Sequence, residues 1–405
     1  MEHKFVSVLK NSTVWIATLG YFVDVYDLFL FGVVRVTSLR GLGVADAQIF
    51  PVGAHLLNLQ MGGMLIGGLL WGILGDKRGR TSVLYGSILL YSLANLANAF
   101  VTDVHMYGLL RLIAGIGLAG ELGAAVTLVS EILPRETRGY GTTVITSVGL
   151  AGAVAAGIVG QKLDWRSAYI LGGCLGLILL LVRIRLRDSA MFLKAQPSAR
   201  GSLMMLVSSP RRFLKYLNCI LVGIPIWFVA AILITFSPEL AREFGVAGPI
   251  TAGNALMANF VGAVLGDLGS GLLSQYLQSR RKVLALFLFL TTAFSIAYLY
   301  TSGMSVLGFY ILCGLLGFSN GYWTVLITVA AEQFGTNLRA TVATSVPSFV
   351  RGAVIPITLS FQFLRGHASL SHSVMMMLGG CMFLAVGSLW FLPETFGCDL
   401  DYLEF

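Results

Sequence analysis

The chain has 405 residues, of which 56% are hydrophobic and only 11% are charged, with a formal net charge of +8 and a mean hydropathy of +0.83. A soluble protein carries about 25% charged residues, so this chain lacks the polar groups that would cover a water-facing surface. The composition therefore excludes a soluble globular protein. It predicts an all-α membrane protein, because long apolar runs rather than short alternating strands fill the sequence.

A helix needs about 20 apolar residues to cross a bilayer. We predict twelve such spans, at residues 13–36, 49–74, 82–101, 105–131, 140–160, 167–186, 214–236, 250–277, 283–302, 305–330, 340–364 and 373–392. The one long polar stretch, 187–213, separates spans six and seven. The sequence thus predicts an N-terminal six-helix bundle over 1–186, a cytoplasmic linker over 187–213 and a C-terminal six-helix bundle over 214–405.

Lysine and arginine are distributed unevenly between the two sets of loops. If the N-terminus is cytoplasmic, that side of the membrane holds 19 of the 27 basic residues and the outer loops hold 5, while Arg35, Arg111 and Arg351 lie within spans. Cytoplasmic loops of membrane proteins are enriched in Lys and Arg. We therefore expect a multi-pass protein of the cell inner membrane with both termini in the cytoplasm. Because topology accounts for the positive charge, we expect the lipid bilayer and no nucleic acid as partners.

The two halves share a recurring pair of charges. Glu131 at the end of span four precedes Arg138 by seven residues, and Glu332 at the end of span ten precedes Arg339 by the same spacing. This repeat predicts two pseudo-symmetric halves, each with a helix that ends in an acid followed by a basic residue.

The loop after span two, from Gly72 to Arg80, reads GILGDKRGR and contains Asp76. It resembles the signature loop of the major facilitator superfamily, Gly-x-Leu-x-Asp-Arg-x-Gly-Arg, with Lys77 in place of the usual arginine. Physically, a glycine-rich turn here presents an acid to helix ends and arginines. The resemblance implies a conformational latch. The second copy of this loop carries Gln275 where the acid would be, which predicts that any latch in the second half is weaker or different.

This resemblance extends over nearly the whole chain and implies a secondary transporter of the major facilitator fold. Members of the superfamily have paired repeats with a substrate site between the halves near the middle of the bilayer. Catalytic, nucleotide-binding and metal-ligand motifs are missing from the sequence. We therefore predict that the protein is not an enzyme and uses no cofactor and no metal, and we expect it to be a monomer.

Span one contains two acids, Asp24 and Asp27, in the stretch GYFVDVYDLFLFG. Residues three apart share a helix face, and two carboxylates in a poorly solvated place cannot both ionise easily. The stretch resembles the metabolite:proton symporter branch of the superfamily and, more weakly, the phosphate:proton symporters. Both branches also carry an acid in span four, where Glu121 falls. We therefore predict Asp24, Asp27 and Glu121 as proton-coupling residues, with a structural ion pair as the alternative for each.

Arginine at position 351 lies inside span eleven, and its guanidinium has the geometry to bind a carboxylate. Arg351 is therefore the predicted anion ligand, with a structural ion pair to Asp267 in span eight as the alternative. Arg111 in span four is a second helix-internal charge and a candidate partner of Asp24 or Asp27. Further side chains predicted to line the substrate site are Tyr26, Trp227, Asn320 and Trp323.

These features predict proton-coupled uptake of a small organic anion, such as a carboxylate metabolite, by alternating access. In the expected cycle an acid takes up a proton from outside, Arg351 binds the anion, and the latch formed by Gly72, Asp76, Arg80, Glu131, Arg138, Glu332 and Arg339 then opens. Alternatives within transport are a zwitterionic solute:proton symporter, a phosphate:proton symporter and a proton-driven exporter. A sensor without transport activity is an alternative from another class.

Overall fold

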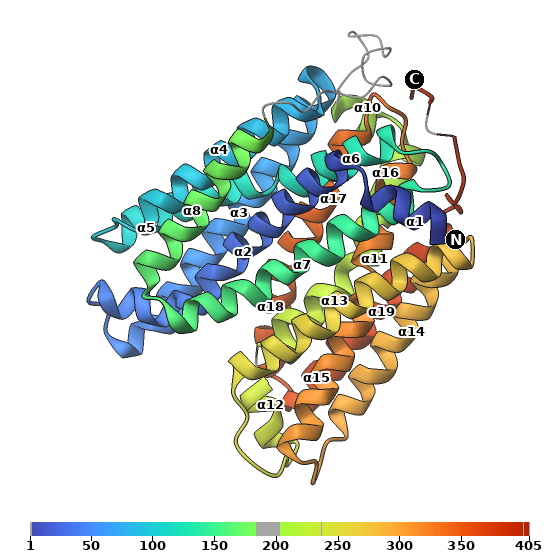
Figure 1. The fold of residues 1–405 in the computed structure, drawn as a ribbon. Coiled ribbons are helices and arrows are strands. Elements are labelled where there is room, and N and C mark those ends of the chain that lie inside the picture. Colours follow the sequence, from blue (N-terminus) through green and yellow to red (C-terminus); the bar gives the residue numbers. More distant parts are fainter. Residues whose placement is uncertain (1, 184–202, 236, 400, 405) are drawn as a thin grey trace.

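A computed structural model of the protein describes residues 2–183, 203–235, 237–399 and 401–404. Within these ranges the chain is helical, apart from one isolated bridge between Ala247 and Ser305. This confirms the predicted all-α fold. Both termini and α10 (Leu203–Ser208), the element that follows the undescribed segment 184–202, lie at the same end of the molecule, which we call the gate end (Figure 1).

The first half begins with the short helix α1 (Glu2–Leu9). Its longer helices are α2 (Ser12–Gly41), α3 (Asp46–Arg78), α4 (Arg80–Asn98), α5 (Val104–Leu118), α6 (Glu121–Ile132), α7 (Arg138–Lys162) and α8 (Trp165–Val182). Side chains cap several of them: Asn11, Asp103 and Asp164 accept backbone N–H bonds at the starts of α2, α5 and α8. Such caps satisfy amide groups that a helix leaves unpaired.

The second half follows α10. Its elements are α11 (Pro210–Phe228), the π-helical turn η3 (Val229–Ile234), α12 (Ser237–Glu243), α13 (Ala252–Tyr276), α14 (Arg280–Leu299), α15 (Val306–Asn320), α16 (Trp323–Glu332), α17 (Arg339–Gly352), α18 (Val354–Arg365) and α19 (Leu370–Phe391). Span seven thus starts at Pro210, four residues before the predicted start, because proline is favoured in the first turn of a helix. Most of the predicted linker lies outside the described residues.

Several spans are built from two consecutive helical segments. Span four breaks between α5 and α6 at Ala119–Gly120, and span ten breaks at the equivalent place in the repeat, between α15 and α16 at Gly321–Tyr322. Span eleven breaks at Ala353, and span seven passes from α11 into η3 just after Pro225. Broken helices at membrane depth are tolerated where the freed backbone groups are buried in protein or line a cavity.

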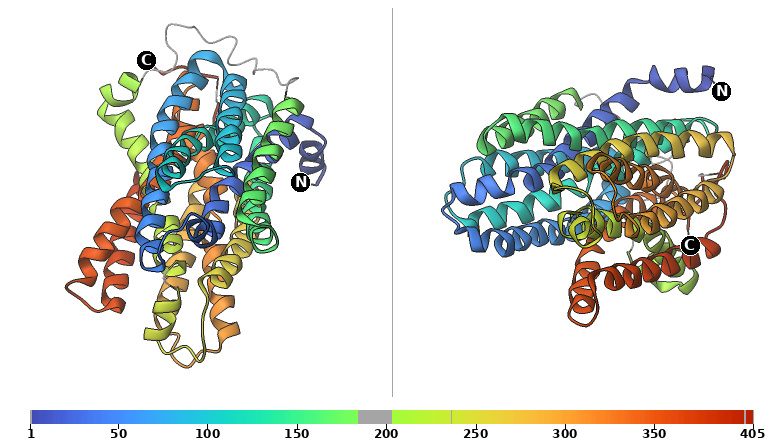
Figure 2. Two further views of the ribbon diagram at one scale, coloured as in Figure 1. Left: turned by 90° about the vertical axis from the view of Figure 1, so that its left-hand side faces the viewer. Right: turned by 90° about the horizontal axis from the view of Figure 1, so that it is seen from below.

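Eleven helical stretches within the described residues are long and apolar enough to cross a membrane. Helix α4, which takes the place of the predicted third span, is not among them, and its buried face carries polar side chains. The helix nevertheless packs between its neighbours like the other spans (Figures 1 and 2). The chain is therefore a multi-pass membrane protein with the predicted helix order.

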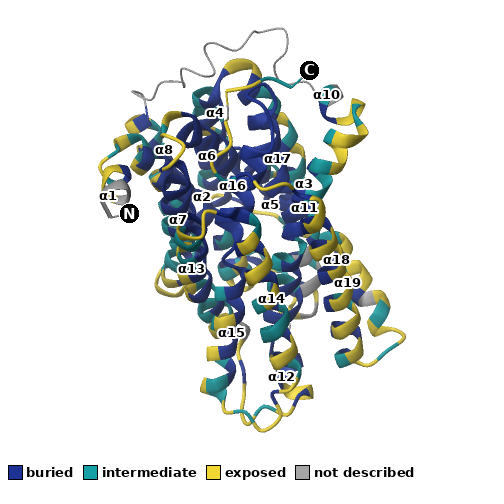
Figure 3. Cartoon of the chain, turned by 90° about the vertical axis from the view of Figure 1, so that its right-hand side faces the viewer, coloured by how far each residue is buried: buried dark blue, intermediate teal, exposed yellow. Residues whose placement is uncertain are grey.

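The middle of the molecule is buried and its outer faces carry exposed residues (Figure 3). Many of the exposed residues are large and apolar. This is the arrangement expected for a protein surrounded by lipid. The interior also holds full charges, since the largest fully buried side chains include Arg80, Arg111, Arg138, Arg183, Arg280 and Arg339. Buried arginines are rare and costly unless they are paired or functional, so these residues lead to the site.

Candidate functional site

A cavity of about 80 Å³ lies between the two halves of the chain. Helices α2 and α7 form one side of it, and the second half forms the other through α11, η3, α13, α15, α16 and α17. Its walls are rich in aromatic rings, namely those of Tyr21, Phe29, Trp227, Phe260 and Trp323. Polar side chains at the cavity are Asn259, Asn320 and Arg351. The cavity thus combines walls of aromatic side chains with a buried cation.

Arg351 is the cation of this cavity. It lies in the last turn of α17, is only 3% exposed, and places its guanidinium carbon 5.6 Å from the centre of the Trp323 ring. The Trp323 indole in turn donates a hydrogen bond of 3.3 Å to the Tyr21 hydroxyl. Among the described residues Arg351 forms no ion pair within 4.0 Å. Its charge is therefore held by a ring and left available to an anion.

Two further polar groups at the cavity have unused hydrogen-bonding capacity. The Trp227 indole nitrogen and the Asn320 side-chain oxygen are buried and have no partner in the described part of the chain. The Asn320 amide nitrogen donates a weak bond of 3.5 Å to the Ile226 carbonyl. Buried polar groups are normally satisfied, so a ligand with donors and acceptors would meet both residues.

The acids of α2 are fully buried. Neither Asp24 nor Asp27 is exposed, and all four of their carboxyl oxygens lack a hydrogen-bond partner among the described residues. Asp24 interacts electrostatically with Arg351 and, across the first half, with Glu121. An isolated buried carboxylate is very costly unless it takes up a proton or gains a partner. This geometry is suited to binding and releasing protons close to the cation of the cavity.

Tyr26 does not contribute to the cavity, contrary to the sequence-based expectation. Its hydroxyl donates a bond of 3.0 Å to the Ala168 carbonyl of α8, inside the first half. The helical turn of 100° per residue gives the reason, because the cavity-facing residues of α2 are Tyr21, Val25 and Phe29. Tyr26 falls on a different face of the same helix.

Arg111 of α5 does not form the expected ion pair with Asp24 or Asp27. It donates a hydrogen bond of 2.6 Å to the Asn95 side chain and lies over the rings of Phe31 and Tyr169, at 5.7 and 5.1 Å. The two rings and the amide hold the guanidinium beyond ion-pair distance from the carboxylates. Arg111 still interacts electrostatically with Asp27.

Glu121 at the start of α6 is paired with Arg183, the residue that follows α8. Two guanidinium nitrogens of Arg183 donate to the two carboxylate oxygens of Glu121, and both side chains are fully buried. Arg183 also donates to the Leu84 and Ile16 carbonyls, at 3.2 and 3.4 Å. Arg183 falls at the end of predicted span six, and the charge count assigns it to the cytoplasmic side of the membrane; in the structure its side chain reaches back into the bundle and neutralises Glu121.

Asp267 of α13 does not pair with Arg351, so that alternative is wrong. Its oxygens accept bonds from the Thr324 backbone N–H and hydroxyl, at 2.7 and 2.6 Å, and a weaker bond of 3.4 Å from Ser147. Thr324 lies in the first turn of α16, where free N–H groups and the helix dipole favour a negative charge. Asp267 therefore serves as a structural cap of the second half that also contacts α7.

At the gate end, the first loop motif contacts the opposite half of the chain. Asp76 accepts bonds from the backbone N–H groups of Ala340 and Thr341, at 3.1 and 2.8 Å, and so caps α17. Arg80 donates to Glu131 at 2.9 Å, and Glu131 also accepts from Arg339 of the second half at 3.1 Å. Close approach is needed here, since a Cβ at Gly72 would lie 2.7 Å from the Thr341 Cα.

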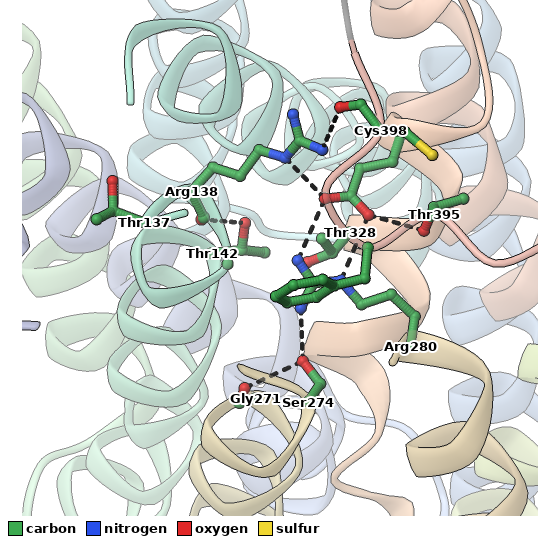
Figure 4. Close-up of polar contacts among 12 residues, drawn as sticks. Thr137, Arg138, Thr142, Gly271, Ser274, Arg280, Thr328, Thr395 and Cys398 are labelled. Atoms are coloured by element: carbon green, nitrogen blue, oxygen red, sulfur yellow. Dashed lines mark hydrogen bonds and ion pairs between the residues drawn. The ribbon is translucent and has the colours of Figure 1, made fainter. Parts of the chain in front are cut away.

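The related network in the second half is centred on Glu332. One of its oxygens accepts from Arg138 of the first half at 2.9 Å and from Arg280 at 3.2 Å, and the other accepts from Thr395 at 2.8 Å (Figure 4). Arg138 also donates to the Cys398 carbonyl at 2.9 Å. Each acid of the repeat is thus bound by an arginine of the other half, so these two networks join the halves at the gate end.

Comparison with known proteins explains this arrangement. The family profile described as Major Facilitator Superfamily matches residues 17–358. The chain belongs to the major facilitator superfamily. It is 30% identical to the 3-(3-hydroxy-phenyl)propionate transporter of Escherichia coli (strain K12) over 77% of this chain and 79% of that protein. It is 25% identical to a probable 4-methylmuconolactone transporter of Cupriavidus pinatubonensis (strain JMP 134 / LMG 1197), over 98% and 94% of the two chains.

The fold is also shared with a solved structure of the superfamily. The transporter FucP, in a crystal structure of its outward conformation, superposes with a TM-score of 0.77 at 14% identity, over 94% of this chain and 99% of that one. The family, the transporter fold and the absence of an enzyme activity expected from the sequence are thus confirmed.

Several residues at the site of this superfamily member are not evident from its sequence. Tyr21, Phe29 and Phe260 line the cavity, but they lie in spans where aromatic residues also occur on lipid-facing and packing faces. Arg183 begins a basic stretch and so reads as a topology signal. Tyr21 lies three residues before Asp24 and so shares a helix face with it, which is the one signal that would have favoured Tyr21.

Proposed function

We propose that this protein is a proton-coupled symporter that takes up a small aromatic carboxylate by alternating access. The observation that carries the proposal is the place of Arg351. This buried cation without a partner carboxylate lies on a tryptophan ring in a cavity walled by aromatic side chains, within electrostatic reach of the unpaired Asp24. A planar ring fits the walls and a carboxylate fits the guanidinium.

The named substrate of the E. coli relative, 3-(3-hydroxy-phenyl)propionate, combines a phenol ring with a carboxylate and so supports this substrate class. The unused polar groups of Trp227 and Asn320 are placed to bind a ring substituent such as a hydroxyl. A phosphate group would leave the aromatic walls without a partner, so the cavity favours a ring acid over phosphate.

Coupling follows from charge balance around Arg351. When Asp24 is charged, it competes with the substrate carboxylate for the field of Arg351; when Asp24 is protonated, the full charge of Arg351 is available to the substrate. Proton and anion therefore favour each other's binding, as linkage requires. The loaded cavity carries less net charge than the cavity with an anion or proton alone, which lowers the cost of enclosing it during the transition.

The gate networks support the direction of access. Asp76, Glu131 and Glu332 close the gate end in this structure, and the Lys and Arg excess of the sequence assigns that end to the cytoplasm. We therefore propose an inner-membrane protein with both termini in the cytoplasm, divided into halves 1–186 and 214–405 and closed here toward the cytoplasm. Proton entry down its gradient would drive uptake.

The proposal is tested by uptake of labelled compounds into liposomes that contain the purified protein. Hydroxybenzoates and hydroxyphenylpropionates would be compared with their neutral amides, with short aliphatic acids, with phosphate and with a betaine. We expect uptake of one or more ring acids that rises when the outside is made acidic and is lost in Asp24→Asn. Equal uptake of the amide, preference for phosphate or betaine, or transport that ignores the pH gradient would contradict the proposal.

A further inference from the structure

Helix α4 carries a buried polar face that the substrate cavity does not use. Ser87, Tyr91 and Asn95 follow one another at four-residue intervals and therefore share a face. All three are fully buried, as is their neighbour Ser92. Polar side chains inside a span usually hydrogen-bond to neighbouring helices, so a row of buried hydroxyls without such bonds calls for another role.

This polar face runs along α4 toward Leu84, whose carbonyl accepts a bond from Arg183 of the Glu121–Arg183 ion pair. At one end, Asn95 accepts the bond from Arg111. In the middle, the Tyr91 hydroxyl is buried and has no partner among the described residues. Two turns earlier on α4, the Leu84 carbonyl accepts a bond of 3.2 Å from Arg183, the residue that binds Glu121.

Glycines of α8 make room for the polar face of α4 and for the Asp27 carboxyl, which together we call the row. A Cβ at Gly172 would collide with the Asp27 carboxyl, and a Cβ at Gly176 would collide with the Ser92 hydroxyl and lie 3.4 Å from the Tyr91 ring. Seven residues after Gly176, Arg183 binds Glu121. One side of α8 therefore follows the row from Asp27 to the gate end.

The groups in this row have free hydrogen-bonding capacity. The hydroxyls of Ser87, Tyr91 and Ser92 and the carboxyls of α2 have no partner among the described residues. A hydroxyl can accept one hydrogen bond while it donates another, and buried polar groups of this kind are commonly bridged by water. The row is therefore able to relay protons, unlike an apolar packing face.

We propose that the α4 polar face is a proton route, separate from the substrate cavity, that leads from Asp24 and Asp27 to Glu121. The inference rests on the proposed proton symport. A proton leaves the aspartic acid, each hydroxyl or bridging water takes one proton and passes another on, and the Glu121 carboxylate receives it and releases it toward the gate end. Arg183 is a positioning residue: protonation of Glu121 weakens their ion pair, and release of the proton toward the gate end restores it.

The second half offers a matched control. Helices α4 and α14 begin at Arg80 and Arg280, so positions 200 residues apart correspond. Thr291 corresponds to Tyr91, but its hydroxyl is satisfied by the Phe287 and Ser319 carbonyls, at 2.9 and 3.1 Å. Thr291→Val therefore removes a buried hydroxyl from the equivalent place without touching the row.

The test compares net uptake with substrate exchange in liposomes. Net uptake of the ring acid requires proton release inside, whereas exchange of labelled for unlabelled substrate does not. We expect Tyr91→Phe and Ser92→Ala to lower net uptake and the accompanying acidification about tenfold or more while exchange stays within twofold of wild type. Thr291→Val should leave both unchanged.

Equal loss of uptake and exchange in both α4 variants would show a structural role and overturn the proposal, as would normal net uptake in both. Measuring two different substitutions guards against one that fails to fold. Absence of acidification in the wild type would instead remove the proposed symport, and the route with it.

Discussion

Replacing Arg351 by glutamine should weaken substrate binding by roughly 30-fold. Arg351 is 3% exposed, its guanidinium lies over the Trp323 ring, and no carboxylate of the described residues lies within 4.0 Å of it, so the place of a bound carboxylate is not taken by a protein side chain. A hydrogen bond to a charged group contributes about 1.5–3 kcal/mol, against about 1 kcal/mol for the neutral bond that glutamine retains. The difference is about 0.5–2 kcal/mol, and its upper end, which we expect for a buried guanidinium, corresponds to roughly 30-fold in Kd.

Binding can be measured by the quenching of intrinsic tryptophan fluorescence, because Trp227 and Trp323 both line the cavity. Arg351→Lys is the matched control; it keeps the charge but loses the planar fork and should fall between wild type and Arg351→Gln. The wild type should prefer a ring acid to its neutral amide, and Arg351→Gln should lose that preference. Unchanged affinity in Arg351→Gln, with the preference retained, would refute the assignment of Arg351 as anion ligand.

Three further predictions concern the gate end. Gln275→Asp should restore an acid to the second loop motif and slow uptake severalfold by stabilising the closed gate, which would appear as lower labelling of the exposed Cys398 by a maleimide; unchanged labelling would argue against a second latch. Gly123→Val should destabilise the closed gate and raise the labelling of Cys398, since a Cβ at Gly123 would lie within 2.6 Å of the Thr344 backbone nitrogen. Gly32→Val is the control: a Cβ there meets open space, and labelling should not change. For Glu394, burial acts to raise the pKa, but bonds from the Ser279 hydroxyl and the Arg280 N–H prevail and lower it below 4.5. The ionised Glu394 side chain should therefore contribute fully to the free energy of unfolding above pH 4.5, and this contribution should fade as the pH falls further. The melting temperatures of wild type and Glu394→Gln should then differ at pH 7 and converge in acid.

The helix order and the gate were largely predictable from the sequence. Apolar runs fix the spans, and the loop from Gly72 to Arg80 and the Glu-to-Arg repeat are specific in sequence. What the repeat does not reveal is that Glu131 and Glu332 are bound by arginines of the opposite half, because the contact depends on how the halves meet.

The interior of the site was less predictable. Helix α2 is apolar on most of its circumference, so its sequence does not fix which face meets the other half, and Tyr21 rather than Tyr26 lines the cavity. A basic residue at a span end is equally consistent with a loop or with a side chain that turns inward, as Arg183 does. The polar residues of α4 occur at helical spacing in the sequence and lower the hydropathy of that span. The sequence does not indicate which side chains of other helices they face.

The central claim is that a ring acid and a proton enter together through Asp24 and Arg351. Its most direct test uses liposomes that contain the purified protein and an internal pH dye, with no imposed gradient. Adding a transported ring acid outside should acidify the interior in the wild type, and the signal should be abolished in Asp24→Asn and Asp27→Asn. Substrate accumulation without acidification, or acidification that persists in both variants, would contradict the account.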